Sequence, residues 1–149
     1  MRANISTGTP LESRAGSSRA VRIGDLLAIA GTAPVAADGT VVAPGDVYGQ
    51  TRRCLQIIAA VLRTAGLATG DVIRTRIMLT DIARWREAAK AHGEVFARIK
   101  PACTVVEVSR FIEPGWLVQV EADCVVRTGS SAPEPAPVDR KVSRGRRSQ

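Results

Sequence analysis

The sequence predicts one α+β domain in which two helices pack on the same face of a β-sheet. Short segments with apolar residues at every second position predict strands, and two longer segments with apolar residues at helical spacing predict helices. Their order is strand, strand, helix, strand, helix, strand, strand, which is typical of a two-layer arrangement. With 149 residues, 45% of them hydrophobic, the chain is long enough to bury a core. No third helix covers the other face of the sheet, so we expect oligomerisation through that face.

Regular structure is expected from residue 16 onward. Residues 1–15 are rich in Ser, Thr, Gly and Arg without apolar periodicity, which predicts a flexible start. Residues 20–23 and 26–31 predict two strands around Gly24-Asp25, a hairpin-type dipeptide. The second of these strands is almost wholly apolar, so we expect it in the centre of the sheet.

Asp46 begins the first predicted helix as its N-cap, because its carboxylate can accept hydrogen bonds from the free N–H groups of the first turn. Gly66 is expected just beyond the C-terminal end. The apolar stripe between them comprises Val47, Thr51, Cys54, Ile58, Val61, Leu62 and Ala65. Since Cys54 lies on this stripe, we favour a buried thiol that packs as a small hydrophobe over a reactive one.

Residues 72–79 predict a strand with two arginines on one face. The alternation places on one side Ile73, Thr75, Ile77 and Leu79. It places on the other side Arg74, Arg76 and Met78. The arginines suit an anionic substrate, but a solvated or inter-subunit face is the interpretation we favour.

Asp81 is expected to cap a second helix that runs to about residue 99 and ends before Pro101. Its stripe comprises Trp85, Ala88, Ala89, His92, Val95 and Phe96. His92 lies on this stripe, so we favour a packed, hydrogen-bonded histidine over a general base.

Residues 101–126 predict two strands joined by a turn at Glu113-Pro114-Gly115. One face of the first strand carries Cys103, Val105 and Glu107. One face of the second strand carries Leu117, Gln119, Glu121 and Asp123. This last face is too polar for a core, so it faces water, a cleft or a partner subunit.

Composition argues against several classes of protein. No apolar run approaches the roughly 20 residues of a transmembrane helix, and the N-terminus lacks the apolar region of a secretory signal, so we expect a cytoplasmic protein with no membrane partner. The odd number of cysteines, three, argues against a disulfide framework. One histidine and no Cys-x-x-Cys pair predict no metal site, and we expect no cofactor.

We place the folded domain at residues 16–127. The net charge of +7 of the whole chain does not by itself indicate a nucleic-acid partner for this domain. Residues 128–149, predicted as a disordered basic tail, carry five basic and two acidic residues and so supply +3 of the total. The five aromatic side chains of the chain are too few for a base-stacking platform. We therefore expect nucleic acid to make at most nonspecific contacts with the tail.

Five segments carry a resemblance to a known family. They are RAVRIGDLLAIAGT at 19–32, GDVYGQTRR at 45–53, VIRTRIMLTD at 72–81, PACTVVEV at 101–108 and VQVEA at 118–122. In this order they resemble the Rid family, also called the YjgF-like or reactive intermediate deaminase family, over roughly residues 16–127. The resemblance implies a chorismate-mutase-like fold, assembled as a homotrimer with three clefts between neighbouring subunits.

The resemblance also implies a chemistry. Archetypal members hydrolyse enamine and imine intermediates, such as 2-aminoacrylate, to 2-keto acids and ammonia. In them an arginine binds the substrate carboxylate through a bidentate pair, and a glutamate in the last strand positions a water. Here Cys103 stands at the position of the arginine and Gln119 at that of the glutamate. Both losses together remove on the order of several kcal/mol of binding and transition-state stabilisation, so the chain looks like a divergent branch of the family.

Other positions of the pattern also differ. Ser17 takes the place of a tyrosine, Ala89 of an asparagine and Val105 of a cysteine. Gly31 matches the family, and Thr32 stands where glutamine or another polar residue is usual.

Two functions remain open. The first is a hydrolase that acts on an imine, enamine or related acyl compound in the cleft. Its catalytic candidates are Cys103, Gln119 and Glu121. Its substrate-binding candidates are Ser17, Gly31, Thr32, Val105 and Glu107. The second is a non-catalytic trimer that binds a metabolite or a protein, and RNA cleavage is disfavoured because no paired base and acid is present.

Overall fold

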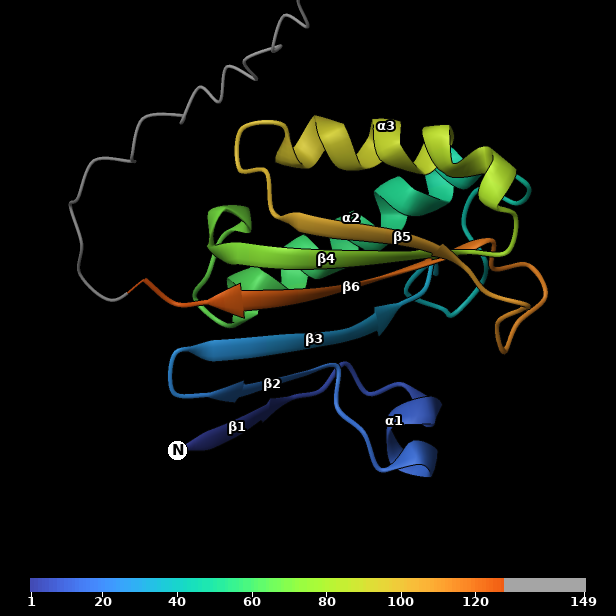
Figure 1. The fold of residues 1–149 in the computed structure, drawn as a ribbon. Coiled ribbons are helices and arrows are strands. Elements are labelled where there is room, and N and C mark those ends of the chain that lie inside the picture. The colour runs from blue at the N-terminus through green and yellow to red at the C-terminus, as the bar shows by residue number, and fades with distance from the viewer. Residues whose placement is uncertain (128–149) are drawn as a thin grey trace, which may run out of the picture.

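The apolar faces of three strands pack against two long helices. In the computed structural model, which describes residues 1–127, β3 (Leu26–Thr32), β4 (Val72–Leu79) and β6 (Val118–Val125) lie next to α2 (Val47–Thr64) and α3 (Trp85–Phe96) on one side of the sheet (Figure 1). The fully buried apolar side chains of this layer include Leu27, Val47, Ile58, Leu62, Ile77, Leu79, Val118 and Val120. Their burial removes apolar surface from water and is the main stabilising contribution to the fold.

The sheet is mixed and has six strands. Its order is β1-β2-β3-β6-β4-β5, where β1 (Arg2–Ile5), β2 (Ala20–Ile23) and β5 (Ala102–Glu107) complete the set. Only the β4–β5 pair is parallel. The predicted α+β arrangement is confirmed, as is the central position of β3.

The N-terminal residues form regular structure that the sequence analysis did not expect. Instead of a flexible start, β1 pairs antiparallel with β2, and α1 (Pro10–Ala15) follows it. The carboxylate of Glu12, buried, accepts hydrogen bonds from the hydroxyl groups of Ser6, Thr7 and Thr9. These bonds, that of Ser6 first, lower the pKa of Glu12 to about 2. The N-terminal segment is therefore ordered because its hydroxyl groups bond to one carboxylate. Its composition, rich in Ser and Thr, does not reveal this order.

A β-bulge corrects the predicted faces of β4. The register against β6 shifts between Val72 and Arg74, so Val72 is buried and Ile73 is 51% exposed. An extra residue in one strand reverses the alternation on one side of it. Thr75, Ile77 and Leu79 face the helices as predicted.

The two long helices follow the predicted caps. Asp46 accepts a hydrogen bond from Gly49 N, and Asp81 accepts one from Ala83 N. The second begins with a short 3₁₀ turn, η2 (Ile82–Arg84), and α3 itself ends at Phe96, earlier than predicted. The buried positions of α3 are Ala88, Ala91 and Phe96. Trp85 and Val95, which were predicted on the buried stripe of this helix, are instead exposed.

The remaining elements are connections. Another 3₁₀ turn, η1 (Thr69–Asp71), precedes β4. None of the helices in residues 1–127 is long and apolar enough to cross a membrane. The predicted tail, residues 128–149, lies outside the described residues.

Gln50 joins the start of α2 to the connection between β5 and β6. Its side chain is fully buried, and Nε2 donates to Gly115 O at 2.9 Å while Oε1 accepts from Leu117 N at 2.9 Å. A buried amide with both ends satisfied fixes the position of this connection. The connection leads directly into β6, so Gln50 also fixes where β6 begins.

We predict that Gln50→Leu lowers the free energy of unfolding by about 1–3 kcal/mol, because it leaves the part-buried Gly115 carbonyl and Leu117 N–H group without their partners. Urea unfolding followed by circular dichroism measures the change. Gln56→Leu, on the exposed side of the same helix, is the matched control and should change stability by less than about 0.5 kcal/mol. Equal effects of the two substitutions would contradict the role of Gln50.

Candidate functional site

The side of the sheet opposite the helices is uncovered and carries a row of polar side chains, which we call the open face. The register pairs Arg76 with Glu121 and Met78 with Gln119, and it brings Arg74 beside Asp123. The partners on the helix side, such as Ile77 with Val120, are buried, so the alternation places these polar pairs on the open side.

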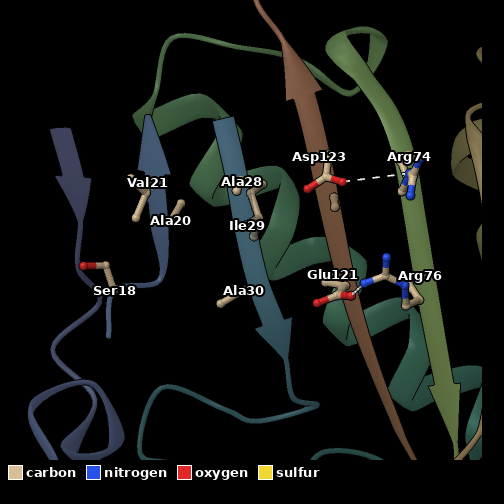
Figure 2. Close-up of a pocket in the computed structure, with 11 residues that line it drawn as sticks. Ser18, Ala20, Val21, Ala28, Ile29, Ala30, Arg74, Arg76, Glu121 and Asp123 are labelled. Atoms are coloured by element: carbon tan, nitrogen blue, oxygen red, sulfur yellow. Dashed lines mark hydrogen bonds and ion pairs between the residues drawn. The ribbon is translucent and has the colours of Figure 1, made fainter. Parts of the chain in front are cut away.

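Two ion pairs cross from β4 to β6 on the open face. Arg76 Nη1 bonds Glu121 Oε1, and Arg74 Nε lies 4.0 Å from Asp123 Oδ2 (Figure 2). More than half of the Arg74 and Asp123 side chains is exposed, whereas Arg76 and Glu121 are less so. The Arg76–Glu121 pair is therefore the better defined of the two, and water screens the Arg74–Asp123 pair.

A hollow of about 260 Å³ lies beside these ion pairs. Its lining residues are Ser18, Ala20, Val21, Ala28, Ile29, Ala30, Arg74, Arg76, Glu121, Ala122 and Asp123. Figure 2 shows alanines of β2 and β3 on one side and the two ion pairs on the other. The small side chains leave the space open, while the charged groups give it a polar wall.

Gln119 lies next to Gly31 on this face. A Cβ atom at position 31 would lie 2.8 Å from Gln119 Oε1 and 3.9 Å from Met78 Cε. The absence of a side chain at Gly31 thus gives the Gln119 amide its room. These two candidate residues are together, and Glu121 is two residues away on the same face.

Ser17 and Thr32 lie at the end of the sheet near α1. Ser17 is exposed and its N–H donates to Glu12 O. Thr32 is buried, and its hydroxyl accepts a hydrogen bond from Arg19 Nη1 at 3.1 Å. Arg19 Nη1 also donates to Gly31 O, so the residue that precedes β2 is joined to the end of β3. Neither Ser17 nor Thr32 lines the hollow.

Cys103, Val105 and Glu107 belong to the other side of the sheet. In the β4–β5 register they pair with residues that face the helices, Cys103 with Thr75 for example. Because β5 is an edge strand, Cys103 and Glu107 are nevertheless exposed. Glu107 Oε1 accepts a hydrogen bond from Ile82 N at 3.1 Å, which holds η2 against β5.

Six of the eight candidate residues therefore form two groups within one protomer, and Ser17 and Thr32 belong to neither. The open-face group is Gly31, Gln119 and Glu121, and the β5 group is Cys103, Val105 and Glu107. Since the two groups lie on opposite sides of the sheet, a single protomer does not bring Cys103 to Gln119 or Glu121.

The remaining cysteines and the histidine have structural positions. Cys54 and Cys124 are buried, and burial raises the pKa of Cys54 to about 12 and that of Cys124 to about 11. His92 is half-buried, bonds the Thr75 hydroxyl at 2.8 Å and stacks on Phe96, and burial lowers its pKa. The predictions of a buried Cys54 and a packed His92 are confirmed. Within residues 1–127 no group of His, Cys, Asp and Glu side chains is arranged to hold a metal ion.

Sequence analysis selected only Glu121 as a site candidate among the residues that line the hollow. It considered Arg74 and Arg76 for an anionic substrate but favoured a solvated or inter-subunit face for them. Asp123 was recognised as part of a polar face, and its cross-strand position opposite Arg74 was the signal that could have selected it. Ser18 and Arg19 follow the candidate Ser17, but no periodicity marks them, because residues 16–19 lie outside any strand.

Comparison with known proteins agrees with this geometry. The model of the family described as Endoribonuclease L-PSP matches residues 7–126. The crystal structure of Rv2704 from Mycobacterium tuberculosis, described as a member of the YjgF family, is 44% identical with a TM-score of 0.77, and the match covers 85% of this chain and 100% of Rv2704. The chain belongs to the YjgF/Rid family.

Other relatives carry related descriptions. A RutC family protein of Pyrococcus horikoshii is 35% identical over 105 residues, which are 70% of this chain and 82% of the relative. The structure of YyfA from Yersinia pestis, described as a Rid family protein of unknown function, is 30% identical with a TM-score of 0.75 and covers 85% of this chain and all of YyfA. The resemblance found in the sequence is confirmed at the level of family and fold.

We predict that Cys54 makes stability depend on alkaline pH. The unfolded thiol releases its proton near pH 9.0, while the buried thiol keeps it to about pH 12. Stability from this group is complete below pH 9 and is lost as pH rises towards 12, by about 1.4 kcal/mol per pH unit. The difference in unfolding free energy between the wild type and Cys54→Ala, measured from pH 7 to 11, should shrink above pH 9. A constant difference over this range would refute the assignment, and Cys103→Ala, at an exposed position, serves as the control.

Proposed function

We propose that this Rid-family protein is a homotrimer that binds a small organic molecule in clefts between its subunits. The observation that carries the proposal is the separation of the candidate residues into two groups on opposite sides of the sheet. In a cyclic assembly the β5 group of one subunit and the open-face group of its neighbour can meet, which one protomer does not achieve.

Exposed apolar side chains on the open face support self-association. Three side chains near one end of this face are each more than half exposed, namely Ile23, Leu26 and Ile73. Val106 lies on the edge strand β5, at another margin of the open face. Leu26 alone is 61% exposed. Such side chains around a partly polar centre are typical of a protein–protein interface.

We predict a trimer in solution whose stability depends on these side chains. Light scattering with size-exclusion chromatography should give three times the 15.8 kDa chain mass. The substitutions Leu26→Glu and Ile73→Glu together should shift the protein towards monomer, because they bury two charges without partners. Val95→Glu, at an exposed position of α3, is the matched control and should leave the mass unchanged. A monomeric wild type, or an unchanged mass in the double variant, argues against this interface.

The groups available in such a cleft favour binding over the archetypal reaction. Glu121 is engaged by Arg76, and Gln119 presents an amide that does not act as a carboxylate base. Cys103 is exposed and lies on the side of the sheet opposite Arg74 and Arg76 of its own protomer, so these cations are not placed to activate the thiol. We infer that the protein binds a polar metabolite and turns over 2-aminoacrylate slowly or not at all.

A hydrolase of altered specificity is the second candidate. The observation that favours it is the contact between Gln119 and Gly31, which orients an amide on the open face where it can hydrogen bond a water or a substrate carbonyl. The reaction class would be hydrolysis of an imine or enamine, with Gln119 as the orienting group and no covalent intermediate. Endoribonuclease activity lacks comparable support, since the single histidine of the chain is packed between α3 and β4.

We predict that restoring two family residues restores activity. The double variant Cys103→Arg with Gln119→Glu should hydrolyse 2-aminoacrylate at least about 100-fold faster than the wild type, because it regains a carboxylate-binding fork and a water-positioning carboxylate. A coupled assay that follows keto acid and ammonia measures the rate. The control is Cys54→Ala, which changes a buried thiol away from both groups and should leave the rate unaltered. Rapid turnover by the wild type that falls on Gln119→Ala would favour the hydrolase, and an inactive double variant that remains trimeric would count against the proposed cleft.

A further inference from the structure

Arg19 is a half-buried cation at the end of β3, and no carboxylate oxygen of residues 1–127 lies within ion-pair distance of it. Its Nη1 donates to Gly31 O and to Thr32 Oγ1, each at 3.1 Å. The register between β2 and β3 ends at Ala20 and Ile29, so no residue of β2 pairs with Gly31. Arg19 therefore supplies the Gly31 carbonyl with a donor beyond the end of β2.

The other edge of the Arg19 guanidinium is free. Neither Nε nor Nη2 has a hydrogen-bond partner within residues 1–127, and neither is fully buried from solvent. The N–H groups of these two nitrogens form a planar fork, which can bond both oxygens of one carboxylate or phosphate group. Arg84 shows this geometry in the same chain, since its Nε and Nη2 each donate to one oxygen of Glu87 at 2.8 Å.

The other half-buried arginines in the part of the chain that the structure describes do not offer such an edge. Arg76 and Arg84 are paired with carboxylates. Arg22 and Arg53 each donate from Nε to a main-chain carbonyl, so one nitrogen of the fork is already used. Arg19 alone among these five keeps both nitrogens of its fork available.

The surroundings of Arg19 favour an anion on one side of it. Burial lowers the pKa of Arg19, and the charge of Glu12 acts in the opposite direction. The Glu12 carboxylate lies beyond ion-pair distance of Arg19 and lines a separate hollow beside α1. Ser18, in contrast, lines the hollow of the open face (Figure 2). We therefore expect an anion on the side of Ser18, away from the negative charge of Glu12.

We propose that Arg19 binds the carboxylate or phosphate group of a small anion through the edge formed by Nε and Nη2. Its bonds from Nη1 hold the guanidinium in place before the ligand arrives, so binding costs little side-chain entropy. The fork and both anchors belong to one protomer, so the site does not need the proposed trimer. It differs from the archetypal carboxylate site, whose arginine would stand at Cys103 on β5.

The test titrates the isotopically labelled full-length chain with sodium acetate and, separately, with sodium phosphate at constant ionic strength, and it follows the arginine Nε–H resonances by NMR. The resonance that is missing in Arg19→Gln should shift and saturate with at least one of the two anions. The backbone N–H resonances of Gly31 and Thr32 report binding in the variants. Arg19→Lys, which keeps the charge but not the fork, should weaken binding roughly tenfold.

Arg22→Gln is the matched control. It removes the same charge from a half-buried position of β2 whose Nε is already bonded to Gly24 O, and it should leave anion binding unchanged. An equal loss of binding in Arg22→Gln and Arg19→Gln would mean that net charge alone attracts the anion, which contradicts the assignment.

Three further results would overturn the proposal. No saturable shift at Arg19 with either anion would show that the guanidinium serves only to anchor β3. Equal binding by the wild type and Arg19→Gln would place the anion elsewhere. Binding by the variant with Leu26→Glu and Ile73→Glu, but not by the wild type, would mean that a carboxylate of a neighbouring subunit already occupies the edge. A monomeric wild type that binds an anion at Arg19 would refute the proposed trimer and support this site, so the two failures are distinguishable.

Discussion

The register between β4 and β6 determines which side chains reach each face of the sheet. These strands are neighbours in the centre of the sheet, and one face of both is buried under α2 and α3. Because side chains alternate along a strand, a slip of β4 by one residue against β6 would bury Arg76 and expose Ile77. The cost of burying that charge and exposing that apolar surface fixes the register, and the register in turn builds the open face.

The side chains on the helix side of the sheet consequently differ in environment from those on the open side. On the helix side, close packing and satisfied polar groups such as Gln50 stabilise the domain. On the open side, small residues of β3 leave a hollow, and the charges opposite it are already paired across strands. A neighbouring subunit that covers this face meets paired charges, so assembly does not leave an isolated ion out of water.

Much of this architecture follows from the sequence because it depends on local patterns. Apolar periodicity and the capping carboxylates of Asp46 and Asp81 predict the helices, and alternation predicts the polar face of β6. The misses have longer-range causes. The bulge at Ile73 depends on how β4 pairs with β6, and the order of β1 and α1 depends on hydroxyl groups that converge on Glu12. Neither is visible in the spacing of apolar residues.

The candidate residues could be selected from the sequence, but their arrangement could not. Cys103 and Gln119 could be selected by their positions in the family pattern, yet their placement on opposite sides of the sheet depends on β6 pairing with β3 and β4 while β5 pairs with β4 alone. Two adjacent elements of the chain are thereby separated by a strand from earlier in the sequence. The separation makes the neighbouring subunit part of any cleft that uses both residues.

The two departures from the family pattern are compatible with each other on electrostatic grounds. An arginine and a glutamate that share a cleft compensate one another, and removing only one leaves an unpaired charge in a partly desolvated site, which is strongly unfavourable. Cys103 and Gln119 are both neutral groups, so the cleft that we propose would differ from the archetypal one without acquiring an uncompensated ion at these positions. Gly31, which gives the Gln119 amide its room, is retained. A retained fold with a changed charge at these two positions is the pattern that our proposal of a bound molecule other than an imino acid predicts.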